Sequence, residues 1–249
     1  MRVLFLGDIV GTAGRMIVKT KLEELKKKYN ADFVIANGEN CNPYNGITSK
    51  EAEELYYSGI DVITLGNHCF KQKSVFNLLD DSVYIIRPSN LPGDVYGRGY
   101  TVVKTQWGSV CVINLLGQVY MEPANNPFHE VDRILNSVHA DYIFVDFHAE
   151  ATSEKRAFGY YADGRVTGVF GTHTHIQTAD EQILPNGTFY ITDAGMTGPM
   201  DSVLGMKIEN SINKFIKRID LPREETDLNT KINGVCADTS DNTIIRFSF

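Results

Sequence analysis

The chain has 249 residues, of which 43% are hydrophobic, and carries a formal net charge of −7 at pH 7. This size and composition allow one large core, and no linker rich in Pro, Ser or Gly divides the chain, so we predict a single domain over residues 1–249. The acidic balance argues against an extended nucleic-acid surface. No apolar run reaches the roughly 18 residues of a membrane-spanning helix, so we expect no membrane partner.

The cysteines and the first residues indicate the compartment. The four cysteines are scattered without CxxC spacing, which is typical of a reduced cytosolic protein rather than of a disulfide framework; they are Cys41, Cys69, Cys111 and Cys236. The opening MRVLFLGDIVG passes from apolar residues into Gly-Asp with no small-residue cleavage site. We interpret it as a first strand and predict a cytoplasmic protein.

Strands and helices alternate in the first half of the chain. Three strands are predicted at residues 2–7, 31–38 and 61–66, and three helices at residues 17–29, 48–59 and 73–80. The first strand, RVLFLG, is continuously apolar, as in a buried parallel strand. Thr48 and Glu51 form a capping-box pattern at the start of the second helix.

Later segments add strands and hairpins. We predict hairpins over residues 99–116, 183–191 and 235–249, a helix over residues 128–138, and strands at residues 141–147 and 166–171. The hairpin at 183–191 has Asn-Gly between two apolar runs, which is a strong turn signal. Alternating strands and helices followed by hairpins predict an α/β layered fold, with mixed β-sheet flanked by helices.

Polar side chains follow five of these strands, most of them through a glycine. They are Asp8, Glu39 with Asn40, Asn67 with His68, His148, and the pair His173 and His175. The carboxyl edge of an open α/β sheet is where ligands bind, so we expect all eight side chains to meet at that edge. Eight donor groups exceed what one tetrahedral ion takes, which predicts two metal ions. Carboxylates, amides and imidazoles without a thiolate favour Fe, Mn, Zn or Co.

These motifs resemble the calcineurin-like metallophosphoesterases: Gly7-Asp8, Gly66-Asn67-His68, the isolated His148, and GTHTH at residues 171–175. Two departures point to one branch of that superfamily. Glu39 stands where the bridging aspartate is usual, and Val10 stands where a histidine is usual. Both departures, with the opening MRVLFLGDIVGTAGR, are similar to the bacterial YmdB-like family over essentially the whole chain.

The resemblance implies a ligand set and an activity. Asp8, Glu39, Asn40 and His175 would hold one metal; Glu39, Asn67, His148 and His173 would hold the other; His68 would act as general acid. The family is similar to phosphodiesterases of cyclic nucleotides such as 2′,3′-cyclic AMP, with a di-iron centre in which manganese can replace iron. Members are cytoplasmic and homo-oligomeric. The eight donor groups fit this chemistry, since two metal ions can activate a bridging water and hold phosphate oxygens.

Two other functions stay open, namely a metal-bound regulatory protein with vestigial activity and, less favoured, a metal-dependent amide hydrolase. Three neighbouring residues have ambiguous roles. Glu150 either orients His148 or lies on a loop surface. Cys41 and Cys69 directly follow predicted site residues, and we interpret them as buried, inert thiols rather than redox groups.

Overall fold

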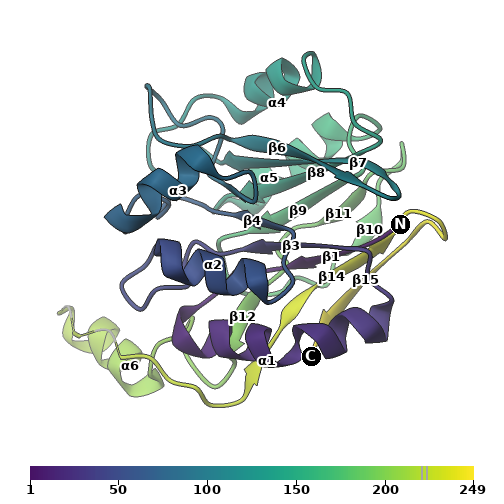
Figure 1. Cartoon of the computed structure of the whole chain (residues 1–249). Coiled ribbons are helices and arrows are strands. Elements are labelled where there is room, and N and C mark those ends of the chain that lie inside the picture. Colours follow the sequence, from purple (N-terminus) through teal and green to yellow (C-terminus); the bar gives the residue numbers. More distant parts are fainter. Residues whose placement is uncertain (220, 223) are drawn as a thin grey trace.

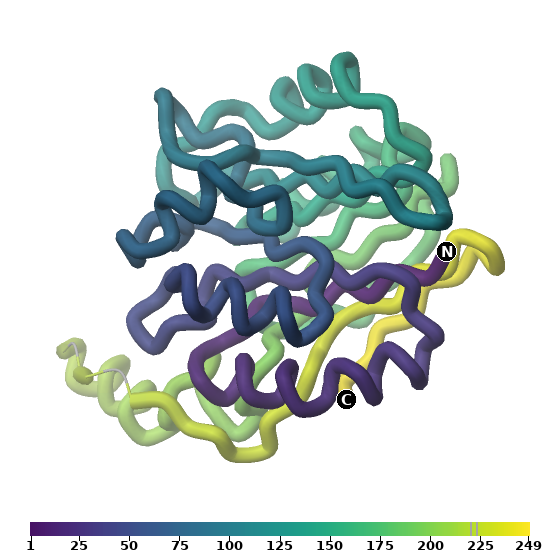
Figure 2. The backbone as a smooth tube through the Cα atoms, in the orientation of Figure 1, coloured from purple at the N-terminus to yellow at the C-terminus, as the bar shows by residue number. Residues whose placement is uncertain are grey.

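Two six-stranded sheets pack face to face between two layers of helices in the computed structural model, which describes residues 1–219, 221–222 and 224–249 (Figure 1). The first sheet has the order β15-β14-β1-β3-β4-β5. Its strands are β1 (Arg2–Leu6), β3 (Phe33–Asn37), β4 (Val62–Thr64), β5 (Ile85–Ile86), β14 (Asn233–Asp238) and β15 (Thr243–Ser248). The first four are parallel, and the C-terminal hairpin β14–β15 continues the sheet in antiparallel fashion beside β1 (Figure 2).

The second sheet has the order β10-β11-β9-β8-β7-β6. Its strands are β6 (Tyr100–Thr105), β7 (Gly108–Leu116), β8 (Tyr142–His148), β9 (Gly168–Thr172), β10 (Gln182–Ile183) and β11 (Phe189–Ile191). The inner strands are parallel, and the two edge strands belong to antiparallel hairpins. A small third sheet joins β2 (Asp8–Ile9), β12 (Met196–Pro199) and β13 (Thr230–Lys231).

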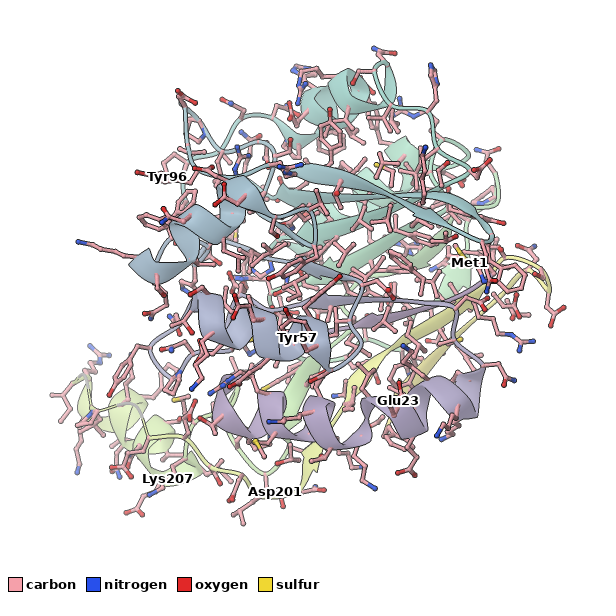
Figure 3. The ribbon with its side chains drawn as sticks, in the orientation of Figure 1. Met1, Glu23, Tyr57, Tyr96, Asp201 and Lys207 are labelled. Carbon is pink, nitrogen blue, oxygen red and sulfur yellow. The ribbon has the colours of Figure 1, made fainter. Side chains whose placement is uncertain are left out.

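The helices cover the outer faces of the sheets. On the first sheet lie α1 (Gly11–Tyr29), α2 (Ser49–Tyr57) and α3 (Phe76–Asp81), the last preceded by the 3₁₀ turn η1 (Lys73–Val75). On the second sheet lie α4 (Pro127–Leu135) and α5 (Thr152–Ala162). The helix α6 (Ile208–Lys217) begins after Lys207 at the periphery of the molecule and has no buried residue among those described (Figure 3). No described helix is both long and apolar enough to cross a membrane.

The apolar run of β1 shows how the sequence produces these layers. Successive side chains of a strand point to opposite faces. Val3 and Phe5 therefore enter the core between the two sheets, while Leu4 and Leu6 enter the core under the helices. A strand buried on both faces needs apolar residues at every position, which explains why no alternation is visible.

The predicted α/β layered fold of mixed sheets flanked by helices is confirmed, and each of the three predicted hairpins forms. One topological prediction was wrong. The site residues do not share one sheet edge, because β1, β3 and β4 lie in the first sheet whereas β8 and β9 lie in the second. The strand-end polar residues therefore meet across the boundary between two sheets.

The start of the first helix was predicted too late. It begins at Gly11 rather than near Ile17. The first turn contains Gly11 and Gly14, which weaken the helix signal in the sequence. At position 14 the small residue is required, since a Cβ atom there would clash with the backbone oxygen of Thr197 in β12.

Candidate metal centre

The eight polar residues predicted from the sequence form one connected cluster at the carboxyl ends of strands from both sheets. Four of the members are completely or almost completely buried: Asp8, Glu39, Asn40 and His148. Gly66 allows this density, because a Cβ atom at that position would clash with Glu39 Oε2 and His148 Nε2. The glycine that precedes Asn67 is thus needed for the close approach of these two side chains.

Glu39 lies at the centre of the cluster. Its Oε1 accepts a hydrogen bond from Asn40 Nδ2 at 2.8 Å and lies 3.3 Å from His148 Nε2. Its Oε2 accepts from the backbone N–H of His68 at 2.9 Å. This carboxylate therefore contacts residues that follow β3 and β4 and the last residue of β8, so it lies between the two halves of the cluster.

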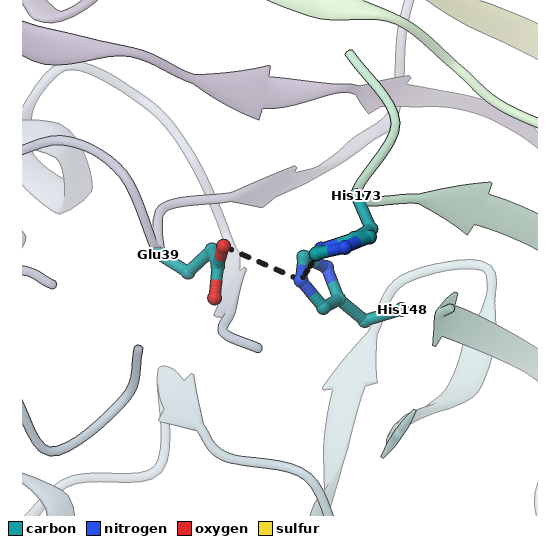
Figure 4. A group of neighbouring side chains, drawn as sticks. All are labelled: Glu39, His148 and His173. Atoms are coloured by element: carbon teal, nitrogen blue, oxygen red, sulfur yellow. Dashed lines mark hydrogen bonds and ion pairs between the residues drawn. The ribbon is translucent and has the colours of Figure 1, made fainter. Parts of the chain in front are cut away.

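His148 forms the junction with the second sheet (Figure 4). Its Nε2 lies 3.1 Å from Asn67 Oδ1 and 3.0 Å from His173 Nδ1, besides its approach to Glu39. Ligand atoms of Glu39, His148 and His173 all lie within 4.8 Å of one another, a spacing suited to a shared metal ion. Imidazole and carboxylate are common ligands of Zn, Fe and Mn.

Asp8 and His175 form the other side of the cluster with Asn40. His175 Nε2 lies 3.2 Å from Asn40 Nδ2 and 3.9 Å from Asp8 Oδ1. Asp8 Oδ2 accepts a hydrogen bond from the backbone N–H of His173 at 3.0 Å, but its buried Oδ1 has no hydrogen-bond partner among the described residues. A buried carboxylate oxygen without a donor is costly unless a cation binds it.

The loop after β9 holds both histidines in unusual backbone conformations. His173 has φ +98° and His175 has φ +65°. Positive φ angles are uncommon for residues other than glycine, and such strain persists only where the surroundings enforce it. Asp193 does so here, since its Oδ2 accepts from Thr174 N at 3.1 Å and from Thr174 Oγ1 at 2.7 Å.

The electrostatics of the cluster favour a positive charge. Burial would raise the pKa of Glu39, but the neighbouring His148 and His68 hold it well below its usual value. Burial would likewise lower the pKa of His148, but the Glu39 and Asp8 carboxylates raise it to about 9. Burial lowers the pKa of His173 to about 3 and that of His175 to about 4, so both are neutral and keep a free lone pair at neutral pH.

His68 lies at the mouth of the cluster. Its Nδ1 is 3.2 Å from Glu39 Oε1, and its Nε2 is 3.2 Å from Asn45 Nδ2. An amide carries both a donor and an acceptor, so Asn45 suits either protonation state of Nε2. Asn45 was not predicted from the sequence, where it is one more polar residue in a loop.

A cavity of about 560 Å³ opens onto the cluster. One wall carries Glu39, Asn40, His68, His173 and His175. The rest of the lining comes largely from the segment before α6, from α6 itself and from the residues that follow it; it includes Val203, Leu204, Met206, Lys214, Phe215 and Pro222. The Gly- and Met-rich stretch 193–206 supplies both β12 and part of this lining.

Several buried polar residues beneath the cluster escaped prediction. Asp146 accepts hydrogen bonds from Thr172 Oγ1 at 2.6 Å and from Asn37 Nδ2 at 2.8 Å, and Lys155 Nζ lies 2.8 Å from Asp193 Oδ2. The available signal was an acidic or amide residue inside an otherwise apolar strand, such as Asp146 in DYIFVDF. Charged residues are almost never fully buried unless they are paired.

Two minor predictions have clear outcomes. Glu150 does not contact His148 in the way considered from the sequence; its Oε2 lies 3.1 Å from His173 Nε2, on a side chain that is 47% exposed. Cys41 and Cys69 are buried, and burial raises the pKa of the Cys69 thiol to about 12. This supports the interpretation of inert thiols, because the thiolate is the reactive form.

The sequence model described as "YmdB-like protein" matches residues 4–247. The chain belongs to the YmdB-like family. A 2′,3′-cyclic-nucleotide 2′-phosphodiesterase of Bacillus subtilis strain 168 is 46% identical to this YmdB-like protein over 245 residues, which is 98% of this chain and 93% of the relative. The family predicted from the strand-end motifs is thereby confirmed.

Two solved structures share the fold of this YmdB-like protein throughout. A hypothetical protein from Thermus thermophilus is 35% identical with a TM-score of 0.94, over 100% of this chain and 99% of that one. A protein from Mycoplasma pneumoniae described as a novel phosphatase is 38% identical with a TM-score of 0.91, over 100% of this chain and 93% of that one.

We expect the buried Lys155–Asp193 pair to be essential for stability. Lys155→Met leaves the Asp193 carboxylate, which is fully buried, without its counter-ion. Breaking a buried pair in this way costs about 3–5 kcal/mol of unfolding free energy. Urea denaturation measures the loss. The matched control is Lys207→Met in the exposed Lys207–Glu224 pair, which should leave the midpoint unchanged. Equal effects of the two substitutions would contradict the structural role.

Proposed function

We propose that this chain is a metal-dependent phosphodiesterase that hydrolyses cyclic nucleotides such as 2′,3′-cyclic AMP. The observation that carries the proposal is the convergence of Glu39, His148 and His173, whose ligand atoms lie within 4.8 Å of one another below an open cavity. The names of two relatives support it, since one is a cyclic-nucleotide phosphodiesterase and another a phosphatase.

The donor atoms fit two transition-metal ions. Asp8, Asn40 and His175 would hold one ion, and Asn67, His148 and His173 the other, with Glu39 shared between them. The unpartnered Asp8 Oδ1 and the three groups that crowd His148 Nε2 support this assignment. Their mixture of oxygen and nitrogen ligands is typical of Fe, Mn or Zn sites, and we propose iron as the native metal, with Mn or Zn as substitutes.

When bound, a pair of metal ions supplies an activated water and a positive clamp for the phosphate oxygens. The chain itself supplies the proton that the reaction requires. Attack of water on the phosphorus breaks the bond to one ribose oxygen, and that oxygen leaves as an alkoxide. We assign its protonation to His68, which lines the cavity beside the cluster and is held by Glu39 and Asn45.

The cavity suits a nucleoside as well as a phosphate. Its volume of about 560 Å³ lies within the usual range of ligand pockets, roughly 300–1,000 Å³. Polar side chains of the cluster line one part of the cavity, and the apolar Leu204 and Phe215 also line it. A cyclic phosphate held at the cluster would therefore direct its base toward α6, where Phe215 offers an aromatic surface.

We further propose a homo-oligomeric assembly and a cytoplasmic location, as the family resemblance implies. We also propose a single domain, which the size and composition of the chain support. The apolar Ile212 and Ile216, which α6 exposes to 49% and 73%, are consistent with an oligomer contact.

The two alternative functions are separated by assays of a cyclic nucleotide, a phosphomonoester and an amide with Fe, Mn and Zn. A regulatory protein with vestigial activity would turn over the phosphate esters only weakly, and an amidase would hydrolyse only the amide.

Wild-type protein purified without chelator should contain two transition-metal ions per chain by elemental analysis. Because Glu39 would contact both ions, Glu39→Gln should reduce metal content and remove most phosphodiesterase activity while the circular dichroism spectrum is retained. The binuclear site is wrong if wild-type protein is fully active with one ion. It is also wrong if Glu39→Gln keeps two ions and wild-type turnover.

His68→Ala should keep both metals and lose rate only where the leaving group needs a proton. General acid catalysis contributes about 10²–10⁴-fold, so kcat/KM for 2′,3′-cyclic AMP should fall within that range. A nitrophenyl phosphodiester should be far less affected, because nitrophenolate leaves without protonation. Equal losses on the two substrates would instead make His68 a phosphate-positioning group, and loss of metal would make it a ligand.

Phe215→Ala should weaken the binding of the base. Base–aromatic stacking contributes about 1–3 kcal/mol, and for a side chain that is 77% exposed the low end applies, so KM for 2′,3′-cyclic AMP should rise roughly five- to tenfold. KM for ethylene phosphate, a cyclic phosphodiester without a base, should not change. The neighbouring Ile216→Ala serves as control, since Ile216 is absent from the cavity lining formed by the described residues. A parallel rise for both substrates would refute base recognition by Phe215.

A further inference from the structure

A buried hydrogen-bond chain runs from the cluster into the boundary between the two sheets. His148 Nδ1 lies 2.9 Å from Thr172 Oγ1, and Thr172 Oγ1 lies 2.6 Å from Asp146 Oδ1. All three side chains belong to the neighbouring parallel strands β8 and β9, and all three residues have a relative exposure of 0%. None of these three residues lines the cavity, so the hydrogen-bonded chain has no direct role in binding substrate.

The direction of the two hydrogen bonds follows from the donor inventory. A threonine hydroxyl has one hydrogen, and a carboxylate can only accept. Thr172 therefore donates to Asp146 and must accept from His148, which places a hydrogen on Nδ1 of the imidazole. The lone pair or second hydrogen of His148 is then confined to Nε2, the nitrogen that faces Glu39, Asn67 and His173.

Asp146 is held in place from the first sheet. Its Oδ2 accepts from Thr64 Oγ1 in β4 and from Asn37 Nδ2 in β3. Asn37 Oδ1 in turn accepts from the backbone N–H of Glu39 at 3.0 Å. The same carboxylate thus connects the histidine of the second sheet to the acidic residue of the first.

We propose that Asp146 and Thr172 are positioning residues that fix the tautomer and the ring orientation of His148, so that Nε2 is presented to a metal ion. The inference rests on the proposed function, because it concerns the residue assigned to one of the two ions. Outer partners of this kind raise metal affinity by typically 10–100-fold.

The test compares two threonines that donate to the same carboxylate. Thr172→Val removes the acceptor of His148 Nδ1–H, whereas Thr64→Val removes a donor to Asp146 without touching His148 in the described structure. Zn²⁺ affinity is measured by chelator competition, and unfolding free energy by urea denaturation of the metal-free proteins.

Thr172→Val should weaken Zn²⁺ binding roughly 10–100-fold. Thr64→Val should lower the unfolding free energy about as much as Thr172→Val does, yet change Zn²⁺ affinity by less than about threefold. Thr172→Ser keeps the hydroxyl and should therefore bind Zn²⁺ with wild-type affinity.

A second measurement reads the tautomer directly. In ¹H–¹⁵N spectra of the Zn²⁺-loaded wild-type protein, the His148 ring should show a slowly exchanging Nδ1–H and a metal-bound Nε2. In Thr172→Val that hydrogen should exchange faster. Equal Zn²⁺ affinities of the two valine variants, or a hydrogen found on Nε2 in the loaded wild type, would overturn the inference alone. Failure of the wild type to bind Zn²⁺ would overturn the proposed function and this inference with it.

Discussion

The burial of two carboxylates, Asp8 and Glu39, between apolar sheets is the constraint on which the rest of the structure depends. An ionised carboxylate out of contact with water is costly unless positive charge or hydrogen-bond donors surround it. Glu39 is compensated by His148 and His68, which hold its pKa well below the usual value after the opposing effect of burial. Burial raises the pKa of Asp8 to about 7, because its neighbours compensate it less completely. The cluster as a whole therefore carries a deficit of positive charge, and metal ions would remove it.

The geometry of such a cluster has to be maintained by the scaffold, since closely packed carboxylate, amide and imidazole groups do not orient one another by themselves. The strained loop of His173 and His175 is supported from below by Asp193, whose own charge is balanced by the buried Lys155. His148 is supported by Thr172 and Asp146. Thr172 and Asp146 lie on strands, Lys155 lies on α5, and Asp193 follows β11 closely, so the supports lie in or beside rigid elements.

Much of this arrangement was predictable from local patterns in the sequence. The run RVLFLG identified a buried strand, because both faces of β1 are covered. The recurring order of strand, turn and polar residue identified all eight members of the cluster, from Asp8 to His175. Prediction failed where a residue acts through distant partners. In the sequence, Asp146 is a single polar residue in an apolar strand. For Glu150 the sequence offered either a contact with His148 or a place on a loop surface, whereas in space its partner is His173. Nor does the pattern of α6 reveal that Phe215 lines the cavity.

The sequence by itself determined the polar groups of the cluster, their places at the ends of strands and the family, since these depend on residue identity and short-range periodicity. The tertiary structure alone decided that the strands separate into two sheets and that their ends meet, because strand pairing depends on contacts between residues far apart in the chain. It also decided which nitrogen of His148 faces the other donors. Thr172 donates its single hydroxyl hydrogen to Asp146 and therefore accepts a hydrogen bond from His148 Nδ1, which leaves Nε2 facing the other donors.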